Sequence, residues 1–194
     1  KKVKADCGDT IWEVAKREGT NIPHLCHSGH KNYKPDGNCR ACMVEIEGER
    51  VLAASCIRKP ADGMKVFSNS ERAKNARDMV LELLLTDQPA REKSPDRSSH
   101  LWKQSEIEGI TQSRFPKVEI DKIPLLDNSH VAMSVNLDAC IHCNLCVRAC
   151  RDVQVNDVIG MSGRGRTAKI VFDQDDKMGS SSCVACGECV QACP

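Results

Sequence analysis

The sequence predicts an α+β protein built from two small units that a helix and a polar segment connect. Three observations predict this fold. The first 68 residues alternate short strand-like runs with one capped helix, residues 68–86 form a long amphipathic helix, and a run of four cysteines occurs twice within residues 131–194. We therefore expect domains over residues 1–68, 69–130 and 131–194.

The first unit opens with an expected strand at residues 1–5. A helix follows, and Thr10 and Glu13 mark its start. These two residues match the T-x-x-E capping box, in which each side chain satisfies a free backbone N–H group of the first turn. Apolar residues then recur at helical spacing, and Gly19 ends the helix. A loop is expected at residues 26–42. A hairpin around a glycine is expected at residues 43–46 and 51–53, and a last strand at residues 64–67.

The longest expected helix covers residues 68–86, where Ser68 and Glu71 form a second capping box. Pro89 and Pro95 prevent it from continuing. Residues 87–130 are polar and weakly patterned, so we expect a packed connecting segment without regular elements. The apolar residues of the helix fall on one face: Ala73, Ala76, Val80, Leu83 and Leu84.

The second unit contains an internal repeat at an offset of 43 residues. Both copies follow the spacing C-x2-C-x2-C-x3-C, and the valine and alanine between the last two cysteines also recur. Strands are expected at residues 153–158 and 168–172, between the two copies. The glycines at 160, 163 and 165 lack the G-x-G-x-x-G order of a dinucleotide site, so we interpret them as a hairpin turn rather than a phosphate loop.

Composition excludes several function classes. Thirteen of the 194 residues are cysteine, whereas Phe, Trp and Tyr together make only 3%. The balance of 28 basic and 27 acidic residues gives no polybasic face for nucleic acid or an anionic membrane. No apolar run reaches the ~18 residues of a membrane span, and no signal peptide is visible. We therefore expect a cytoplasmic protein, in which clustered cysteines indicate metal sites before disulfides.

The repeated run has the ligand spacing of paired [4Fe–4S] clusters. One tight loop at x2 spacing can supply three thiolates, and in paired runs the fourth cysteine of each run ligates the other cluster. Zinc is the alternative, but zinc sites usually show two C-x2-C pairs or mixed Cys and His ligands. The predicted ligand sets are Cys140, Cys143, Cys146 and Cys193 for one cluster, and Cys183, Cys186, Cys189 and Cys150 for the other.

A [2Fe–2S] cluster is predicted in the first unit, because two irons need two thiolates each and a long loop with a distal cysteine can supply them. Its predicted ligands are Cys26, Cys39, Cys42 and Cys56. His24, His27 and His30 crowd this loop, and a Rieske centre would use two histidines. Since four cysteines suffice, we expect these histidines to face solvent or to support the ligands without binding iron. Cys7 is left as a spare small residue.

The whole chain resembles the N-terminal electron-transfer region of the α subunit of cytosolic NAD-dependent formate dehydrogenases, which contain molybdenum or tungsten. The most specific segment is residues 136–161, and the two four-cysteine runs are more general. The large iron–sulfur subunit of NADH:quinone oxidoreductase and the [FeFe]-hydrogenases share this architecture. The segments that carry the resemblance are residues 23–27, 38–45, 54–56, 83–91, 113–116, 135–161 and 183–194.

The resemblance implies a β-grasp [2Fe–2S] ferredoxin domain whose first strand is missing, a helical linker, and a double-cluster [4Fe–4S] ferredoxin-like domain. It also implies that the chain continues past Pro194 into a molybdopterin domain with Mo or W, and that a diaphorase partner subunit carries FMN and NAD. This region would then transfer electrons between the formate-oxidising site and the partner, without catalytic residues of its own. The alternatives are the same role in NADH:quinone oxidoreductase or [FeFe]-hydrogenase, or a scaffold that its metal stabilises without redox function.

One motif of these relatives is missing. They commonly carry H-x3-C-x2-C-x5-C after the long helix, which holds an additional [4Fe–4S] cluster. Here the four positions are occupied by Gln88, Glu92, Pro95 and Leu101, and His100 is out of register. None of these residues replaces the ligand, so we expect the additional cluster to be lacking. The substitution disfavours the quinone-reductase and hydrogenase alternatives, which usually keep the motif.

Overall fold

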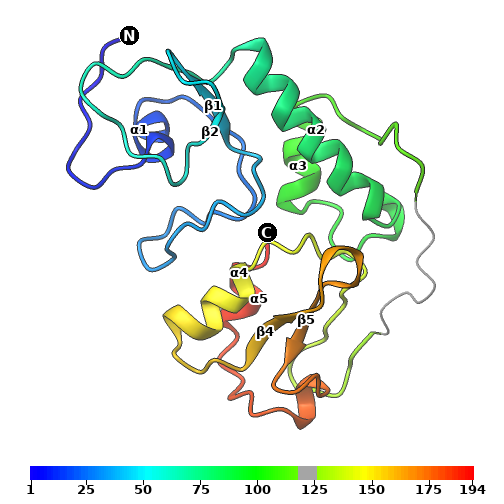
Figure 1. The fold of residues 1–194 in the computed structure, drawn as a ribbon. Coiled ribbons are helices and arrows are strands. Elements are labelled where there is room, and N and C mark those ends of the chain that lie inside the picture. Colours follow the sequence, from blue (N-terminus) through cyan, green and yellow to red (C-terminus); the bar gives the residue numbers. More distant parts are fainter. Residues whose placement is uncertain (118–125) are drawn as a thin grey trace.

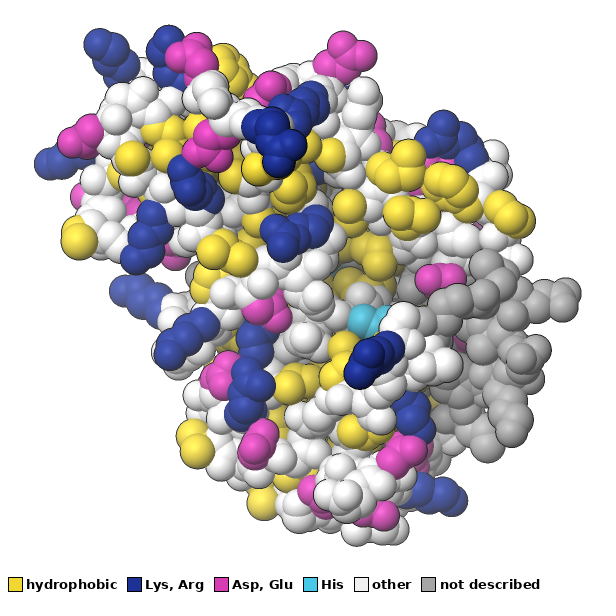
Figure 2. Space-filling model, viewed as in Figure 1, with side chains coloured by type: hydrophobic (Ala, Val, Ile, Leu, Met, Phe, Trp, Pro, Cys, Tyr) yellow, Lys and Arg dark blue, Asp and Glu magenta, His cyan; other side chains and the backbone are white. Residues whose placement is uncertain are grey.

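The computed structural model describes residues 1–117 and 126–194. Residues 1–68 form a first half, residues 126–194 form a second half, and a pair of helices from residues 69–117 lies beside the first half (Figure 1). Part of the expected connecting segment, residues 118–125, lies outside the described residues. None of the described helices is long and apolar enough to cross a membrane. Basic and acidic side chains are interspersed on the face seen in Figure 2, in agreement with the balanced charge.

The first half begins without the strand expected at residues 1–5, because no described strand pairs with this segment. Its helix α1 (Ile11–Arg17) starts at the predicted capping box. The Thr10 hydroxyl accepts a hydrogen bond from the Glu13 N–H at 3.3 Å, and the Glu13 carboxylate accepts one from the Thr10 N–H at 2.7 Å. The capping box prediction is therefore confirmed.

A three-stranded antiparallel sheet in the order β2–β1–β3 packs against α1. Its strands are β1 (Met43–Ile46), β2 (Ala53–Ala54) and β3 (Val66–Phe67). The predicted hairpin is present and pairs Met43 with Ala54, although its second strand begins two residues later than expected. Val44 and Ile46, alternate residues of β1, are buried against α1.

Helix α2 (Glu71–Asp87) is the longest element, and it starts later than predicted. Ser70 caps it, because the Ser70 hydroxyl accepts a hydrogen bond from the Ala73 N–H at 3.2 Å. The capping box predicted at Ser68 and Glu71 is therefore wrong: Glu71 is the first residue of the helix and not the third.

This cap gives a direct stability prediction. Ser70→Ala should lower the free energy of unfolding by about 1 kcal/mol, because the Ala73 N–H loses its acceptor. Ser68→Ala is the matched control and should change it by less than about 0.5 kcal/mol. Urea denaturation of both variants measures the difference, and equal losses would contradict the assignment of the cap.

The buried face of α2 also differs from the prediction. Leu83, predicted to be in the core, is exposed, whereas Arg77 and Glu82 are buried. Both charged residues are buried with partners: Arg77 donates hydrogen bonds to two backbone carbonyls, and Glu82 forms an ion pair with Arg114 at 2.8 Å. The buried residues of the helix are Ala73, Arg77, Leu81, Glu82, Leu85 and Thr86.

The connecting segment contains two elements that the sequence did not predict, a 3-10 turn η1 (Arg91–Lys93) and helix α3 (His100–Ile107). The Ser99 hydroxyl caps α3 at 3.5 Å from the Trp102 nitrogen. Leu101 and Trp102 pack into a core shared with α2 and the loop of the first half. The expectation of a segment without regular elements is therefore wrong for these residues.

The second half is built around a two-stranded antiparallel sheet. Strand β4 (Ile159–Ser162) pairs in full with β5 (Lys169–Phe172). The strand expected at residues 153–158 is wrong, because this segment follows a π-helical turn, η2 (Ala149–Val153), and Val155 has a φ of 57° that no strand accommodates.

The predicted turn at the glycines is confirmed in part. Gly160 lies within β4, whereas Gly163 turns the hairpin with a φ of 77°. A Cβ atom at Gly163 would lie 2.3 Å from the Thr167 carbonyl oxygen, so only glycine fits there. Short 3-10 turns follow at η3 (Gly165–Thr167) and η4 (Met178–Ser180).

Two short helices, α4 (Leu145–Arg148) and α5 (Glu188–Ala192), lie side by side in the second half (Figure 1). Each helix begins directly after a left-handed residue, Asn144 with a φ of 61° or Gly187 with a φ of 77°. Both the helices and these residues are separated by the 43-residue offset of the repeat. The repeat found in the sequence is therefore also a repeat of backbone structure.

Cysteines form a large part of the second core. Cys150 is buried there among six apolar side chains, of which Phe172 is the one aromatic. Four further cysteines are partly buried against the same cluster: Cys140, Cys146, Cys183 and Cys189. Thiols therefore occupy positions that large apolar side chains fill in ordinary cores.

Candidate iron–sulfur sites

The four cysteines predicted for the [2Fe–2S] cluster come from a loop and from both ends of the β1–β2 hairpin. Cys26, Cys42 and Cys56 are each at most 1% exposed. Cys26 and Cys39 form two reciprocal hydrogen bonds, in which the backbone N–H of each donates to the sulfur of the other at 3.4 Å. The fold of the first half thus brings distant cysteines to one buried place.

These four thiols form two pairs, Cys26 with Cys39 and Cys42 with Cys56. In each pair a hydrogen bond between the side chains raises the pKa of one thiol, Cys26 or Cys56. The same hydrogen bond lowers the pKa of its partner, Cys39 or Cys42. Two adjacent sulfurs per pair fit the two thiolates that each iron of a [2Fe–2S] cluster takes.

The two copies of the repeat place backbone N–H groups against sulfur in the same way. His142 and Ala185 are both left-handed, with φ values of 52° and 58°. Their N–H groups lie 3.4 Å from the sulfurs of Cys140 and Cys183. A left-handed conformation costs a non-glycine residue roughly 1–2 kcal/mol. The matched pair therefore indicates a constraint that both loops share.

The fourth cysteine of the first run lies with the second run. Cys150 lines one cavity together with Cys183, Cys186 and Cys189. Its sulfur also accepts a hydrogen bond from the Val158 N–H at 3.3 Å. This set of four thiols around a cavity fits a four-thiolate cluster.

The fourth cysteine of the second run lies with the first. Burial raises the pKa of Cys143 and of Cys146 to about 12, and the neighbouring charges of Cys140 and Cys193 contribute to both shifts. Burial likewise raises the pKa of Cys140, with Cys193 again contributing. Cys193 is thus close to the three cysteines of the other run.

Among the residues that the structure describes, no group of three or more His, Cys, Asp or Glu side chains is gathered tightly enough to hold a single metal ion. A zinc site needs four ligands within bonding distance of one ion. A cluster of several irons instead takes thiolates spread around a larger body, as the cavity-lining set is. What favours iron–sulfur clusters over zinc is the spacing of the two cysteine runs, C-x2-C-x2-C-x3-C.

Two histidines of the first half, His24 and His27, pack edge-on against Trp12. His27 and His24 lie with ring centroids 4.5 and 4.6 Å from that of Trp12, and His24 lies 4.8 Å from His100. His30 is exposed. Burial lowers the pKa of His24 to about 4 and also lowers the pKa of His27 and His100. Of the two expected environments, exposure to solvent is therefore found for His30 and not for His24 and His27, for which support of the ligands without binding iron stays a prediction.

The buried histidines should make the fold sensitive to acid. A histidine whose pKa is lower in the folded protein takes up its proton preferentially on unfolding, so stability is lost as the pH falls from about 6.5 towards 4. His100→Gln should flatten this dependence, because it removes one lowered pKa and the positive neighbour of His24. Thermal unfolding between pH 7 and pH 4.5 measures it, with exposed His30→Gln as control. An unchanged slope in the His100 variant would contradict the assignment.

The residues at the positions of the additional cluster motif lie in and around α2, η1 and α3. Gln88 and Glu92 line a cavity of about 670 Å³ together with Trp102. Leu101 is 2% exposed and packs into the core that α3 shares with α2 and the loop of the first half. Amide, carboxylate and apolar groups stand there in place of thiolates, and the lack of a cluster at this site stays a prediction. Cys7, the spare cysteine, is exposed.

Among the described residues, polar contacts between the halves were not predicted, and they are made by three residues, Arg148, Asn38 and Tyr33. The Asn38 amide donates to the His142 carbonyl at 2.6 Å, and the Tyr33 hydroxyl donates to Glu188 at 2.7 Å. One signal was available in the sequence. Arg148 stands where the second copy of the repeat has Gln191, and such a break marks a position with its own role.

Two family models match the chain. Residues 1–71 match the 2Fe-2S iron-sulfur cluster binding domain, and residues 132–194 match the 4Fe-4S dicluster domain. The first contains the four cysteines of the β1–β2 region, and the second contains both copies of the repeat.

The curated relatives are similar over most of the chain. The NADP-reducing hydrogenase subunit HndD of Solidesulfovibrio fructosivorans is 34% identical, over 96% of this chain and 32% of its own length. The mitochondrial NADH-ubiquinone oxidoreductase 78 kDa subunit of Candida albicans is 33% identical, over 88% of this chain and 24% of its own length. The chain thus spans between about a quarter and a third of the length of these relatives.

A solved structure agrees with the fold of both halves. A chain of the NAD+-reducing [NiFe]-hydrogenase in the H2-reduced state superposes with a TM-score of 0.81 at 30% identity, covering 94% of this chain and 76% of that one. The cluster-binding domains, the relatives and the shared fold lead to one conclusion. The chain belongs to the family of iron–sulfur regions found in the 75/78 kDa-type subunits of NADH–quinone oxidoreductases and in subunits of NAD(P)-reducing hydrogenases.

Proposed function

We propose that this chain transfers electrons within an NAD(P)-linked redox complex of the NADH–quinone oxidoreductase or NAD(P)-reducing hydrogenase type. The observation that carries the proposal is the match of residues 1–71 and 132–194 to a 2Fe-2S cluster binding domain and a 4Fe-4S dicluster domain, which together contain the twelve cysteines of the predicted sets. This function takes precedence over formate oxidation because the relatives described above are subunits of a hydrogenase and of an NADH–ubiquinone oxidoreductase.

The residues that would hold the clusters are the three predicted sets. When bound, each cluster supplies one-electron redox chemistry with little change in geometry. The paired thiols of the first set and the exchange of fourth cysteines between the runs support one [2Fe–2S] and two [4Fe–4S] clusters. The assigned ligands are Cys26, Cys39, Cys42 and Cys56; Cys140, Cys143, Cys146 and Cys193; and Cys183, Cys186, Cys189 and Cys150.

The chain's own residues would tune these sites by hydrogen bonds and by burial. The N–H groups of His142 and Ala185 point at ligand sulfurs, as does that of Val158. Such N–H groups stabilise added negative charge on sulfur and so favour reduction. Burial of Cys26 and Cys56 excludes water from the first site. A β-grasp first domain, a double-cluster second domain and boundaries at residues 68 and 130 are part of this proposal.

The proposal implies a partner subunit that binds flavin and NAD(P). Each four-thiolate cluster adds about −2 to the charge when oxidised, so three clusters would take the formal charge of +1 to roughly −5. We therefore expect the partner to dock through a basic surface. FMN and NAD would belong to that subunit and not to this chain.

A formate-oxidising molybdopterin domain, following this region in the same chain, is a second candidate. The observation that favours it is the set of residues at the additional cluster motif. Gln88, Glu92, Pro95 and Leu101 provide no thiolate or imidazole, whereas quinone-reductase and hydrogenase subunits usually carry that motif. NAD(P) reduction by the full complex with formate, with H2 and with quinol as alternative donors separates the candidates.

Anaerobic counting of iron and sulfide, with electron paramagnetic resonance (EPR) after dithionite reduction, tests the function. We expect about ten irons per chain, two plus four plus four, in centres that dithionite reduces and oxidants restore. About fourteen would show that the Gln88 region still binds a cluster. Eight or fewer in fully loaded protein would remove the [2Fe–2S] assignment. If the centres could not be reduced and reoxidised, electron transfer would be refuted and a structural role would take its place.

A further inference from the structure

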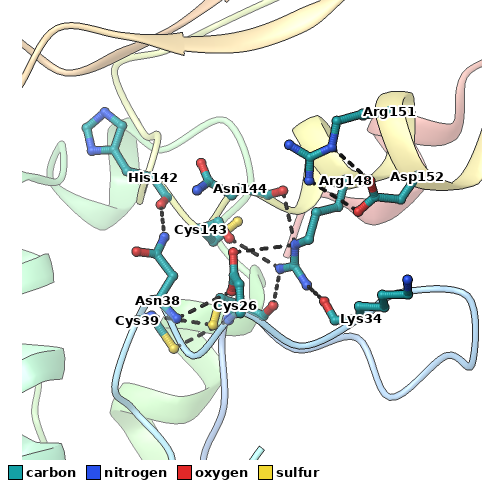
Figure 3. Close-up of polar contacts among 11 residues, drawn as sticks. Cys26, Lys34, Asn38, Cys39, His142, Cys143, Asn144, Arg148, Arg151 and Asp152 are labelled. Carbon is teal, nitrogen blue, oxygen red and sulfur yellow. Dashed lines mark hydrogen bonds and ion pairs between the residues drawn. The ribbon is translucent and has the colours of Figure 1, made fainter. Parts of the chain in front are cut away.

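Arg148 is a buried cation whose hydrogen-bond partners come from both halves of the molecule. It is the last residue of α4, and its side chain is 4% exposed. One terminal nitrogen donates to the Lys34 carbonyl at 2.7 Å. The other donates to the Cys26 carbonyl and, at 3.4 Å, to the Cys143 carbonyl (Figure 3). The guanidinium thus connects the Cys26 loop with the first copy of the repeat.

Among the described residues, Arg148 forms an ion pair with a single carboxylate, and that carboxylate is partly exposed. Its nearest carboxylate oxygen, on Asp36, lies 3.6 Å from Nε, and the Asp36 side chain is 33% exposed. Its hydrogen bonds go to backbone carbonyls, which solvate a cation without cancelling its charge. Burying a cation in this way is costly unless negative charge lies nearby.

The two cluster sites on either side would supply further negative charge near Arg148. Cys26 is a proposed ligand of the [2Fe–2S] cluster and Cys143 of a [4Fe–4S] cluster, and the guanidinium touches the backbone of both. An iron–sulfur cluster with four thiolates carries net negative charge, which grows by one on reduction. A fixed cation between the two sites therefore favours the reduced state of both.

The surroundings show that this junction is packed. The side chains of Cys26, Tyr33, Cys143, Leu145 and Ala149 form one buried cluster across the two halves. The hydrogen bond from Asn38 to the His142 carbonyl runs beside it (Figure 3). The guanidinium donates to four backbone carbonyls, those of Cys26 and Lys34 in the first half and those of Cys143 and Asn144 in the second. Because it is planar and holds them in fixed directions, it sets the distance between the Cys26 loop and α4.

We propose that Arg148 is a positioning residue for electron exchange between the [2Fe–2S] site and the [4Fe–4S] site of Cys140, Cys143, Cys146 and Cys193. It clamps the Cys26 loop onto α4, and it holds one positive charge close to both centres. The inference rests on the proposed function. The second copy of the repeat has exposed Gln191 at this position, so the device belongs to the first copy alone.

Two substitutions separate the clamp from the charge. Arg148→Gln, which introduces the residue of the second copy, removes both. Arg148→Lys keeps the charge but cannot hold four carbonyls in the fixed directions of a guanidinium. Arg151→Gln is the matched control, because Arg151 follows three residues later, is exposed and pairs with Asp152 at 2.8 Å.

Potentials and spin coupling are measured on the intact protein by anaerobic redox titration followed by EPR. For Arg148→Gln we expect the equilibrium for reduction of both centres to become at least tenfold less favourable, which is about 59 mV for one electron. The spin–spin interaction between the two reduced centres should also weaken. Arg148→Lys should weaken that interaction while changing the equilibria by less than tenfold. Arg151→Gln should leave both quantities unchanged.

The failures can be distinguished. Unchanged potentials and spin coupling in Arg148→Gln, with full iron content, would overturn the inference and leave the proposed function intact. Equal shifts in Arg148→Gln and Arg151→Gln would also overturn it, because they would show a general charge effect. If Arg148→Gln loses iron, unchanged spin coupling in Arg148→Lys overturns it. A parent protein without reducible clusters would instead overturn the proposed function.

Discussion

Replacing Cys193 with serine should remove one [4Fe–4S] cluster and leave the other two centres bound. Cys193 neighbours Cys140, Cys143 and Cys146, although it belongs to the other four-cysteine run. Iron content should fall from about ten to about six per chain, with matching loss of sulfide and of one EPR signal. Cys7→Ser, at the exposed spare cysteine, is the control and should keep all the iron.

The reciprocal variant makes this test specific. Cys150 lines a cavity with the second run, so Cys150→Ser should remove the other [4Fe–4S] signal. Cys183→Ser should remove the same signal as Cys150→Ser. If Cys193→Ser and Cys183→Ser abolished the same signal, each run would hold its own cluster and the exchange of fourth cysteines would be refuted.

Removal of the clusters by an iron chelator should unfold the second half and leave the first half largely folded. Counting buried and partly buried side chains alike, five cysteines accompany nine other apolar residues in the second core, so we expect the metal to supply much of its stability. Structural metal binding is worth about 10–16 kcal/mol in zinc-finger peptides, which is comparable to the whole stability of a domain of about 5–15 kcal/mol. The first half keeps Trp12, Ile22, Val44 and Ile46 in an apolar core.

Hydrogen exchange by segment measures this difference directly. Amides of β4 and β5 should lose their protection after chelation, whereas those of α1 and α2 should retain most of theirs. Both tryptophans, Trp12 and Trp102, lie outside the second half, so their fluorescence serves as an internal control that should change little. Loss of protection in both halves together would show that the molecule folds as a single unit.

The sequence was most informative where short-range rules decide the structure. The capping box at Thr10, the hairpin around Gly48 and the repeat of the cysteine runs all depend on residues a few positions apart. The spacing of the cysteines limits which of them one loop can bring together. The α+β class and the presence of 2Fe-2S and 4Fe-4S domains followed from these local patterns.

Contacts between distant segments were not predictable in the same way. The buried face of α2 includes Arg77 and Glu82, whose partners lie far away in the chain, so helical periodicity of apolar residues gave a face that differs. Helix α3 was missed because it has only eight residues and its adjacent Leu101 and Trp102 show no helical period. The left-handed Val155 ended a strand that strand propensity alone favoured.

The junction at Arg148 also fixes an order of events during synthesis. The guanidinium reaches back 122 residues to Cys26 and 114 residues to Lys34. At 5–20 residues per second, a ribosome needs about 6 to 24 s to make the intervening chain. During that interval α4 has not yet been made, so the carbonyls of the Cys26 loop are hydrated and its thiols lie open to solvent. Docking of the two halves at Arg148 therefore has to wait for the synthesis of α4, and the Cys26 loop stays open until then.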